Sequence, residues 1–151
     1  MRAAFYRGTR PGLAGLVNRM GRLFGHGPYS HVELVLGDRS SASASFDDGG
    51  VRRKVIRYRH RDSWDFLELP IGLEPGAWGW LETHIGKKYD LLGNVHFALG
   101  ALRDSPDRFF CSEAVGCMLG WQDAWRYEPN GQAQRMIEQY GARFVPGPWE
   151  E

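Results

Sequence analysis

The sequence predicts an α+β fold in which an antiparallel sheet, or a small open barrel, packs against one buried helix. Strand-like segments separated by short turns follow one another between residues 30 and 70, and helical segments follow them. One helical segment is almost entirely apolar: from Ala114 to Leu119 every residue is apolar or glycine. A helix of that composition is expected to be surrounded by protein on most sides.

Length and composition are those of a globular protein. The 151 residues are expected to form one domain, 1–151, that is large enough to bury a single core. The net charge of +1 provides no overall field for nucleic acid or an anionic membrane. No apolar run approaches about 18 residues, and the first residues lack the apolar core of a signal peptide. We therefore expect no transmembrane segment, no nucleic-acid partner and a cytoplasmic location.

The first elements are a short strand over residues 3–6 and an amphipathic helix over residues 13–24. Apolar residues recur in the helix at positions i, i+3 and i+4, while Arg19 and Arg22 lie off that stripe. A Gly-His-Gly-Pro segment then ends the helix.

The next strand, over residues 29–36, places an imidazole and a carboxylate on one face. Side chains alternate along a strand, so His31 and Glu33 point the same way as Val35, and the apolar positions 32, 34 and 36 point the other way. Gly37 and Asp38 stop this strand.

With this strand, three or four antiparallel strands are expected between residues 30 and 70. A small, polar strand over 40–46 pairs with its predecessor through an Asp-Arg turn, and an Asp-Asp-Gly-Gly turn leads to a basic strand over 51–58. A strand over 64–70 ends at proline. The basic cluster at 52–61 is typical of a solvated strand face, or of a surface that meets an anionic ligand such as a phosphate or carboxylate.

The second half of the chain reads as mainly helical. The helix over 76–85 has Trp78, Leu81 and Ile85 as its buried stripe, and Gly86 to Asp90 break it. Further segments are an apolar helix over 91–102, a loop over 103–106, a segment over 121–127 that covers one end of the core, a helix over 132–140 with Asn130 as N-cap, and a last strand or tail at 144–145.

Cys111 lies at the start of the apolar helix, where Ser112 and Glu113 mark a polar end that we expect to be accessible. The positive end of the helix dipole favours thiolate over thiol, and the unpaired N–H groups there can bind an oxyanion. A cysteine in an apolar helix is also compatible with an inert core residue, which is how we interpret Cys117. The two cysteines are six residues apart and point in different directions, so they are not expected to pair. A Ser105-Pro106 N-cap would start the helix one turn earlier.

A thiol, an imidazole and a group that orients the imidazole are the components of a cysteine hydrolase. Cys111 and His31 supply the first two. A zinc site built from His26, His31 and a cysteine lacks any standard ligand spacing. We therefore expect neither a metal nor another cofactor.

Two motifs resemble a known superfamily. Residues 29–37, Tyr-Ser-His-Val-Glu-Leu-Val-Leu-Gly, resemble the histidine-bearing strand of the NlpC/P60 papain-like superfamily, and residues 109–115 resemble its cysteine-bearing helix start. The histidine precedes the cysteine here, as in the circularly permuted branch of YiiX-like and lecithin:retinol-acyltransferase-like proteins. The resemblance implies a permuted papain-like fold.

Two weaker motifs extend the resemblance. Residues 86–90, Gly-Lys-Lys-Tyr-Asp, are similar to a Gly-x-x-Tyr-Asp segment of the superfamily whose tyrosine lines the site, which is Tyr89 here. A Ser-His-Val-Glu-Leu-Val strand followed by the Asp-Gly-Gly-Val of residues 48–51 is similar to compact proteins encoded by tailed phages and prophages.

The group that orients His31 has two candidates. In the superfamily it lies about a dozen positions after the histidine, where this chain has Ser43 within Ser-Ala-Ser-Ala-Ser. Glu33 is chemically stronger, but side chains at i and i+2 run parallel, and a nearby arginine is an alternative partner for it. Geometry favours Ser43.

The resemblance implies cleavage of an amide or peptide bond, for example in cell-wall peptide, through an acyl-enzyme on Cys111 with His31 as base and then acid. The expected catalytic residues are Cys111, His31, Ser43 and Glu33, and the expected partner is a small peptide, amide or acyl substrate. The residues expected to bind it are Tyr89, Ser112 and Glu113. The alternatives are a lipid or thioester acyltransferase or esterase with the same dyad, and a non-catalytic phage structural or binding module.

Overall fold

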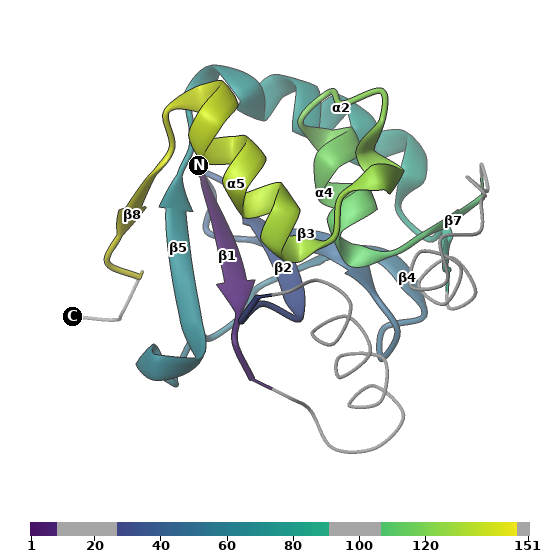
Figure 1. Ribbon diagram of the computed structural model, residues 1–151. Coiled ribbons are helices and arrows are strands. Elements are labelled where there is room, and N and C mark those ends of the chain that lie inside the picture. Colours follow the sequence, from purple (N-terminus) through teal and green to yellow (C-terminus); the bar gives the residue numbers. More distant parts are fainter. Residues whose placement is uncertain (9–26, 91–106, 148–151) are drawn as a thin grey trace.

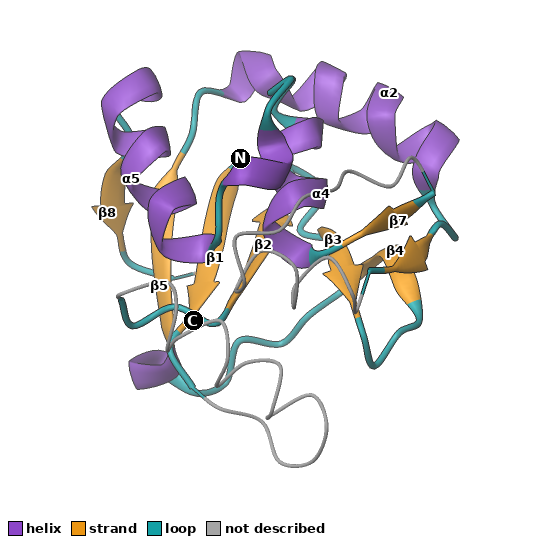
Figure 2. Cartoon of the chain, turned by 45° about the vertical axis from the view of Figure 1, so that its right-hand side comes forward, coloured by secondary structure: helices purple, strands orange, loops and turns teal. Residues whose placement is uncertain are grey.

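The computed structural model describes residues 1–8, 27–90 and 107–147, and the helices expected over 13–24 and 91–102 lie outside these ranges. The described residues form an α+β fold in which a curled, open sheet carries its helices on one side (Figures 1 and 2). The α+β class that the sequence predicts is therefore observed.

The sheet has eight strands in the order β7-β6-β4-β3-β2-β1-β5-β8. Every neighbouring pair is antiparallel except β6 and β7, which run parallel, so the sheet is mixed rather than antiparallel as expected. The strands are β1 (Arg2–Tyr6), β2 (His31–Val35), β3 (Ser41–Ser45), β4 (Gly50–Lys54), β5 (Trp64–Glu68), β6 (Lys88–Tyr89), β7 (Arg108–Phe109) and β8 (Arg143–Val145).

The order of the strands departs from a simple succession of hairpins at β1. The hairpins β2-β3 and β3-β4 form as expected, but β5 pairs with β1, which lies between β2 and β5. Three consecutive residues of β1, Ala3, Ala4 and Phe5, have no exposed surface. The small alanine side chains let both neighbouring strands and the layers above and below pack closely.

The two faces of the sheet bury different clusters. On the helix side, Val32 and Leu34 of β2 join the main core with residues of the three α-helices that the structure describes. On the other side, Val35 packs with Ala4 and Tyr58 in a smaller cluster. This division follows the alternation predicted for β2.

Within the described ranges the helices are α2 (Glu74–His84), α4 (Cys111–Met118) and α5 (Pro129–Tyr140), with 3₁₀ turns η1 (Arg61–Ser63), η2 (Ile71–Leu73) and η3 (Ala124–Arg126). Leu81 of α2 is buried and Trp78 is half-buried, as predicted. Ile85 is not: it follows the end of the helix and is 55% exposed, and Ala77 takes its place in the core.

The N-cap of α5 is Glu128 rather than Asn130. The carboxylate of Glu128 accepts hydrogen bonds of 2.6 Å from the backbone N–H groups of Asn130 and Gly131. The side chain of Asn130 instead accepts from the Tyr29 N–H and donates to the Tyr29 carbonyl, at 2.9 and 3.1 Å. Asn130 thereby ties α5 to the residues that precede β2.

Helix α4 is buried along almost its whole length, as its apolar composition predicts. Gly116 allows η3 to pack closely against it, since a Cβ at that position would lie 2.8 Å from the Cβ of Ala124. Cys117 is half-buried at the edge of the core rather than fully inside it. The two cysteines form no disulfide with each other, as expected.

Within the described ranges, none of the helices has the length and apolar character required to cross a membrane.

Candidate functional site

His31 is the first residue of β2, at the end where β2 and β3 part. The two strands pair only at Leu34 with Ala42 and at Val35 with Ser41. Closer to His31, a side chain replaces the backbone pairing: the hydroxyl of Ser43 donates a 2.7 Å hydrogen bond to the Val32 carbonyl. The parted strands leave the His31 side chain accessible to an element other than β3.

That element is the start of α4. Phe110 is still extended, with φ −95° and ψ 170°, so the helix begins at Cys111. The parallel pairing of Tyr89 on β6 with Phe109 on β7 holds the chain just before this point. The Cys111 side chain is a close enough neighbour of the His31 ring to raise the pKa of that ring through its charge and hydrogen bonding. The structure therefore brings together the two residues that the motifs single out.

The third member of the site is Glu33. Its Oε1 atom lies 2.7 Å from Nε2 of His31, and its side chain has no exposed surface. Because the carboxylate occupies Nε2, the other ring nitrogen, Nδ1, remains for the thiol. His31 therefore has Glu33 as a hydrogen-bond partner and Cys111 as a second neighbour that interacts with its ring.

Glu33 is itself held by an arginine from β4. Arg52 donates from Nη1 to Oε2 of Glu33 at 2.6 Å and from Nη2 to Oε1. This two-pronged contact is the strongest geometry available to a guanidinium and a carboxylate. A carboxylate without solvent contact requires such a partner, since burial of an unpaired charge is strongly unfavourable.

The charged groups of the site shift each other's pKa values. Burial opposes protonation of His31, but the hydrogen bonds and charges of Cys111 and Glu33 outweigh it and raise the pKa of His31 to about 9. Burial likewise opposes ionisation of Glu33, and the hydrogen bonds from Arg52 and His31 outweigh it and lower the pKa of Glu33 to about 2. An imidazolium beside a carboxylate is thus the state favoured at neutral pH.

Ser43 does not orient His31, contrary to our expectation. Its hydroxyl donates to the Val32 carbonyl and contacts the Ala44 carbonyl at 3.3 Å, so it stabilises the backbone of the sheet instead of contacting the imidazole. The expectation was wrong because side chains at i and i+2, although parallel, are still able to contact each other when one of them is long. Glu33 is long enough to reach His31 along the strand.

Ser112 and Glu113 are not accessible either. Ser112 has no exposed surface and Glu113 is 3% exposed. The carboxylate of Glu113 folds back on the helix start and accepts from the Phe110 N–H at 3.3 Å. The accessible polar end that we expected for α4 is therefore wrong, because both side chains are turned into the protein, and their contact with substrate stays a prediction.

Tyr89 is half-buried next to the strand that leads to Cys111. Its ring packs edge-on against Phe46, with a centroid distance of 6.0 Å, and its backbone N–H donates to the Gly49 carbonyl. Tyr89 therefore lies between the β3-β4 turn and the start of α4.

Arg52 is a site residue that the sequence did not single out, although a nearby arginine was an alternative partner for Glu33. We expected it on a solvated strand face or against an anionic ligand, but it turns inward to Glu33. The sequence does contain a signal for this partner. A glutamate on a buried strand requires a cation, and the serine and alanine residues of the strand between Glu33 and Arg52 leave room for one.

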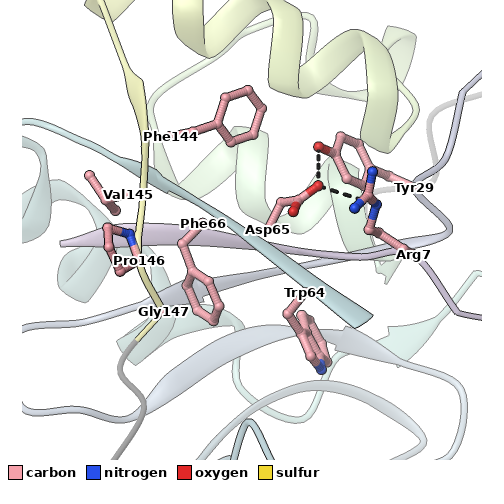
Figure 3. Close-up of a pocket in the computed structure, with 9 residues that line it drawn as sticks. All are labelled: Arg7, Tyr29, Trp64, Asp65, Phe66, Phe144, Val145, Pro146 and Gly147. Atoms are coloured by element: carbon pink, nitrogen blue, oxygen red, sulfur yellow. Dashed lines mark hydrogen bonds and ion pairs between the residues drawn. The ribbon is translucent and has the colours of Figure 1, made fainter. Parts of the chain in front are cut away.

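A separate cavity of about 570 Å³ lies where β5 extends beyond β8 (Figure 3). There the Tyr29 hydroxyl donates to Oδ2 of Asp65 at 2.7 Å, and Nε of Arg7 lies 3.4 Å from the same oxygen. Burial, followed by the hydrogen bond to Asp65, raises the pKa of Tyr29 above its ordinary value. The Tyr29 ring also packs on Phe5 at 5.0 Å. These contacts fix the residues that precede His31.

The described residues contain no group of three or more His, Cys, Asp or Glu side chains arranged to hold a metal ion, and His26 lies outside them. No protein-family model matches the chain, and no curated protein or solved structure matches it significantly.

Proposed function

We propose that this protein is a cysteine hydrolase that cleaves an amide or peptide bond through an acyl-enzyme on Cys111. The observation that carries the proposal is the continuous arrangement of Cys111, His31 and Glu33 at the start of a buried helix. A thiol next to an oriented imidazole is the common feature of such enzymes. Together with the resemblance of the two motifs, this arrangement favours a permuted papain-like domain of the NlpC/P60 type.

The first half of the reaction forms the acyl-enzyme. The Cys111 thiolate adds to the carbonyl carbon, and the oxyanion is stabilised by first-turn N–H groups of α4 that have no partner within the helix. When the C–N bond breaks, the amine leaves with the proton of the His31 imidazolium. A C–S bond now links the acyl group to Cys111, and His31 is neutral.

The second half releases the acid. A water molecule attacks the acyl carbon while His31 takes its proton, and the C–S bond breaks to give the carboxylic acid and the thiolate-imidazolium pair. Glu33 fixes the ring and stabilises its charged form in both halves. The resemblance to cell-wall enzymes makes short cell-wall peptides the first substrates to test.

The test combines turnover with trapping of the intermediate. Wild-type protein is incubated with cell-wall tetrapeptides, an acyl thioester and a lipid ester, quenched in acid and examined by mass spectrometry. We expect amide cleavage, with the acyl mass on the peptide that contains Cys111, and loss of both in Cys111→Ala. Cys117→Ala is the matched control and should remain active, because Cys117 lies at the other end of α4.

Other outcomes separate the alternatives. Cleavage of the thioester or lipid ester without amide cleavage would replace the proposal by acyl transfer or ester hydrolysis on the same dyad. Absence of turnover on all three, with no adduct on Cys111, would support a non-catalytic binding module. Turnover that survives in Cys111→Ala would exclude the proposed mechanism.

A further inference from the structure

A chain of alternating charges extends from the candidate site to the surface. Beyond His31 and Glu33 it continues through Arg52 to Asp48, where Nε of Arg52 lies 2.8 Å from Oδ2. Nζ of Lys54 in turn lies 2.7 Å from Oδ1 of Asp48. Exposure rises along this path: the side chains of Arg52, Asp48 and Lys54 are 12%, 27% and 46% exposed.

Every nitrogen of the Arg52 guanidinium has a partner. Nη1 and Nη2 donate to the two oxygens of Glu33, and Nε donates to Asp48. A planar group held at three corners cannot rotate, so it fixes the plane and the direction of the Glu33 carboxylate. The oxygen that receives Nη2 is the same Oε1 that accepts from His31. The position of Arg52 therefore sets the position of the His31 partner.

The sheet explains how Arg52 reaches Glu33 although β3 lies between their strands. Arg52 pairs directly with Ser43, so both side chains lie on the same face of the sheet. Ser43 is small and directs its hydroxyl to the Val32 carbonyl, which leaves space above β3 for the guanidinium. The serine and alanine residues of β3 thus have a role in the site without touching His31.

Asp48 connects this arrangement to the turn between β3 and β4. It precedes Gly49 and Gly50, and it lies four residues before Arg52 on the returning strand. Burial opposes ionisation of Asp48, but the hydrogen bonds from Lys54 and Arg52 outweigh it and lower its pKa to about 2. Asp48 is therefore ionised at neutral pH and holds Nε of Arg52, while Glu33 holds the two Nη atoms.

We propose that Arg52, held in place by Asp48, is a positioning residue that keeps Glu33 ionised and aimed at His31. Arg52 acts through Glu33 and has no role as a proton donor or nucleophile. The inference rests on the proposed function only for the roles of Cys111 and His31. It assigns a function to one residue of the basic strand and to the acidic turn before it.

The test measures the reactivity of Cys111 without any substrate. In a Cys117→Ala background, the single thiol is treated with methyl methanethiosulfonate across pH, and the methyl disulfide is quantified by mass spectrometry. A thiolate-imidazolium pair reacts from acidic pH and shows a second rise when His31 loses its proton, whereas an isolated thiol shows one rise near about 8.5. The variants are Arg52→Lys, Asp48→Asn and Arg52→Ala.

Arg52→Lys keeps the charge but loses the two-pronged contact, and Asp48→Asn frees one corner of the guanidinium. We expect both to move the second rise to lower pH, by about one unit for Arg52→Lys, because a less well-placed carboxylate stabilises the imidazolium less. Guanidinium chloride, far below denaturing concentrations, should move the rise of Arg52→Ala back toward the wild-type position. A purely structural role would not respond to the small cation.

Arg53→Lys is the matched control. Arg53 is the next residue on the same strand, but its guanidinium donates to Ser40 and Asp38 and stacks on Trp78. The same substitution there should leave both rises unchanged. If Arg52→Ala does not fold, judged by circular dichroism, Arg52→Lys and Asp48→Asn still decide the question.

The failures are distinguishable. A single rise near about 8.5 in the Cys117→Ala parent, or no reaction at all, would remove the thiolate-imidazolium pair and with it the proposed function. Two rises in that parent that stay in place in Arg52→Lys and Asp48→Asn would overturn only the positioning role. If the second rise moved equally in Arg52→Lys and Arg53→Lys, the cause would be the loss of an arginine in general rather than the loss of the contact between Arg52 and Glu33.

Discussion

Nε2 of His31 lies 2.7 Å from Oε1 of Glu33, two residues further along the same strand. Two residues of a strand span about 6.6 Å, so side chains at this spacing meet only when they bend toward each other. Here the bend is possible because β2 and β3 part beside His31 and because Arg52 holds the carboxylate from across β3. The orienting group for the imidazole therefore comes from the strand of the histidine itself.

Glu33→Gln should lower the pKa of His31 and move the basic limb of activity to lower pH by about one unit or more. The amide keeps the shape of the side chain but removes the negative charge that stabilises the imidazolium. The measurement is the pH dependence of kcat/KM on a cleaved amide, or of thiol reactivity. Ser43→Ala is the control: it should keep the profile and lose only about 1 kcal/mol of stability with the Val32 bond. A shifted profile in Ser43→Ala and an unchanged one in Glu33→Gln would restore the family-like role of Ser43.

Cys111→Ala should lower the pKa of His31 below about 9. Burial acts to lower this pKa, and the charge and hydrogen bond of Cys111 are the largest effects that raise it. The measurement is NMR titration of the His31 ring in wild type, Cys111→Ala and the control Cys117→Ala, with His31→Gln to identify the resonance. We expect a shift in Cys111→Ala alone. Equal titration in all three proteins would mean that the thiol and the imidazole do not interact in solution.

The stability of the protein should fall at both ends of the pH range. The pKa of Glu33 is lowered from 4.5 to about 2, so its contribution is complete above pH 4.5 and is lost as the pH falls through about 2. The pKa of His31 is raised from 6.5 to about 9, so its contribution is complete below pH 6.5 and is lost as the pH rises through about 9. The measurement is the free energy of unfolding by urea at fixed pH.

Two variants assign these losses. Asp38 and Asp48 also have a pKa lowered to about 2, so the acid loss in Glu33→Gln should be smaller than in wild type but not absent. Cys111→Ala should reduce the alkaline loss. If the unfolding free energies of wild type and Glu33→Gln changed in parallel between pH 2 and 5, folding would not lower the pKa of Glu33.

The larger strands and helices and the hairpins β2-β3 and β3-β4 could be predicted from local pattern, but the pairing of β1 with β5 could not. Alternation and turn residues indicated β2 and β3 to within one or two residues. The strands β6 and β7 were missed, because two residues carry no periodicity. That β5 pairs with β1 depends on contacts between distant segments, which local sequence does not encode.

The site shows the same division. The motifs indicated Cys111 and His31 together, and in the structure the two side chains are near enough for Cys111 to raise the pKa of His31. The role of Arg52 was missed because a run of basic residues does not say which of them faces inward. The accessible end expected for α4 was wrong because Ser112 and Glu113 are polar residues that the fold buries. Both errors concern the direction of a side chain, which depends on the packing of neighbouring elements.

Gly50→Ala should destabilise the protein by about 3 kcal/mol or more, and Gly49→Ala by only about 1–2 kcal/mol. A Cβ at Gly50 would lie 1.9 Å from the backbone carbonyl of Lys87, so β6 would have to leave β4. At Gly49, with φ +78°, nothing lies within 4 Å and only the backbone conformation opposes alanine. Because β6 also pairs with β7, which leads directly into Cys111, Gly50→Ala should alter the rate of thiol modification while Gly49→Ala preserves it. Thermal unfolding and thiol labelling of both variants measure these effects, and equal losses in the two would mean that β4 and β6 do not pair as closely as described.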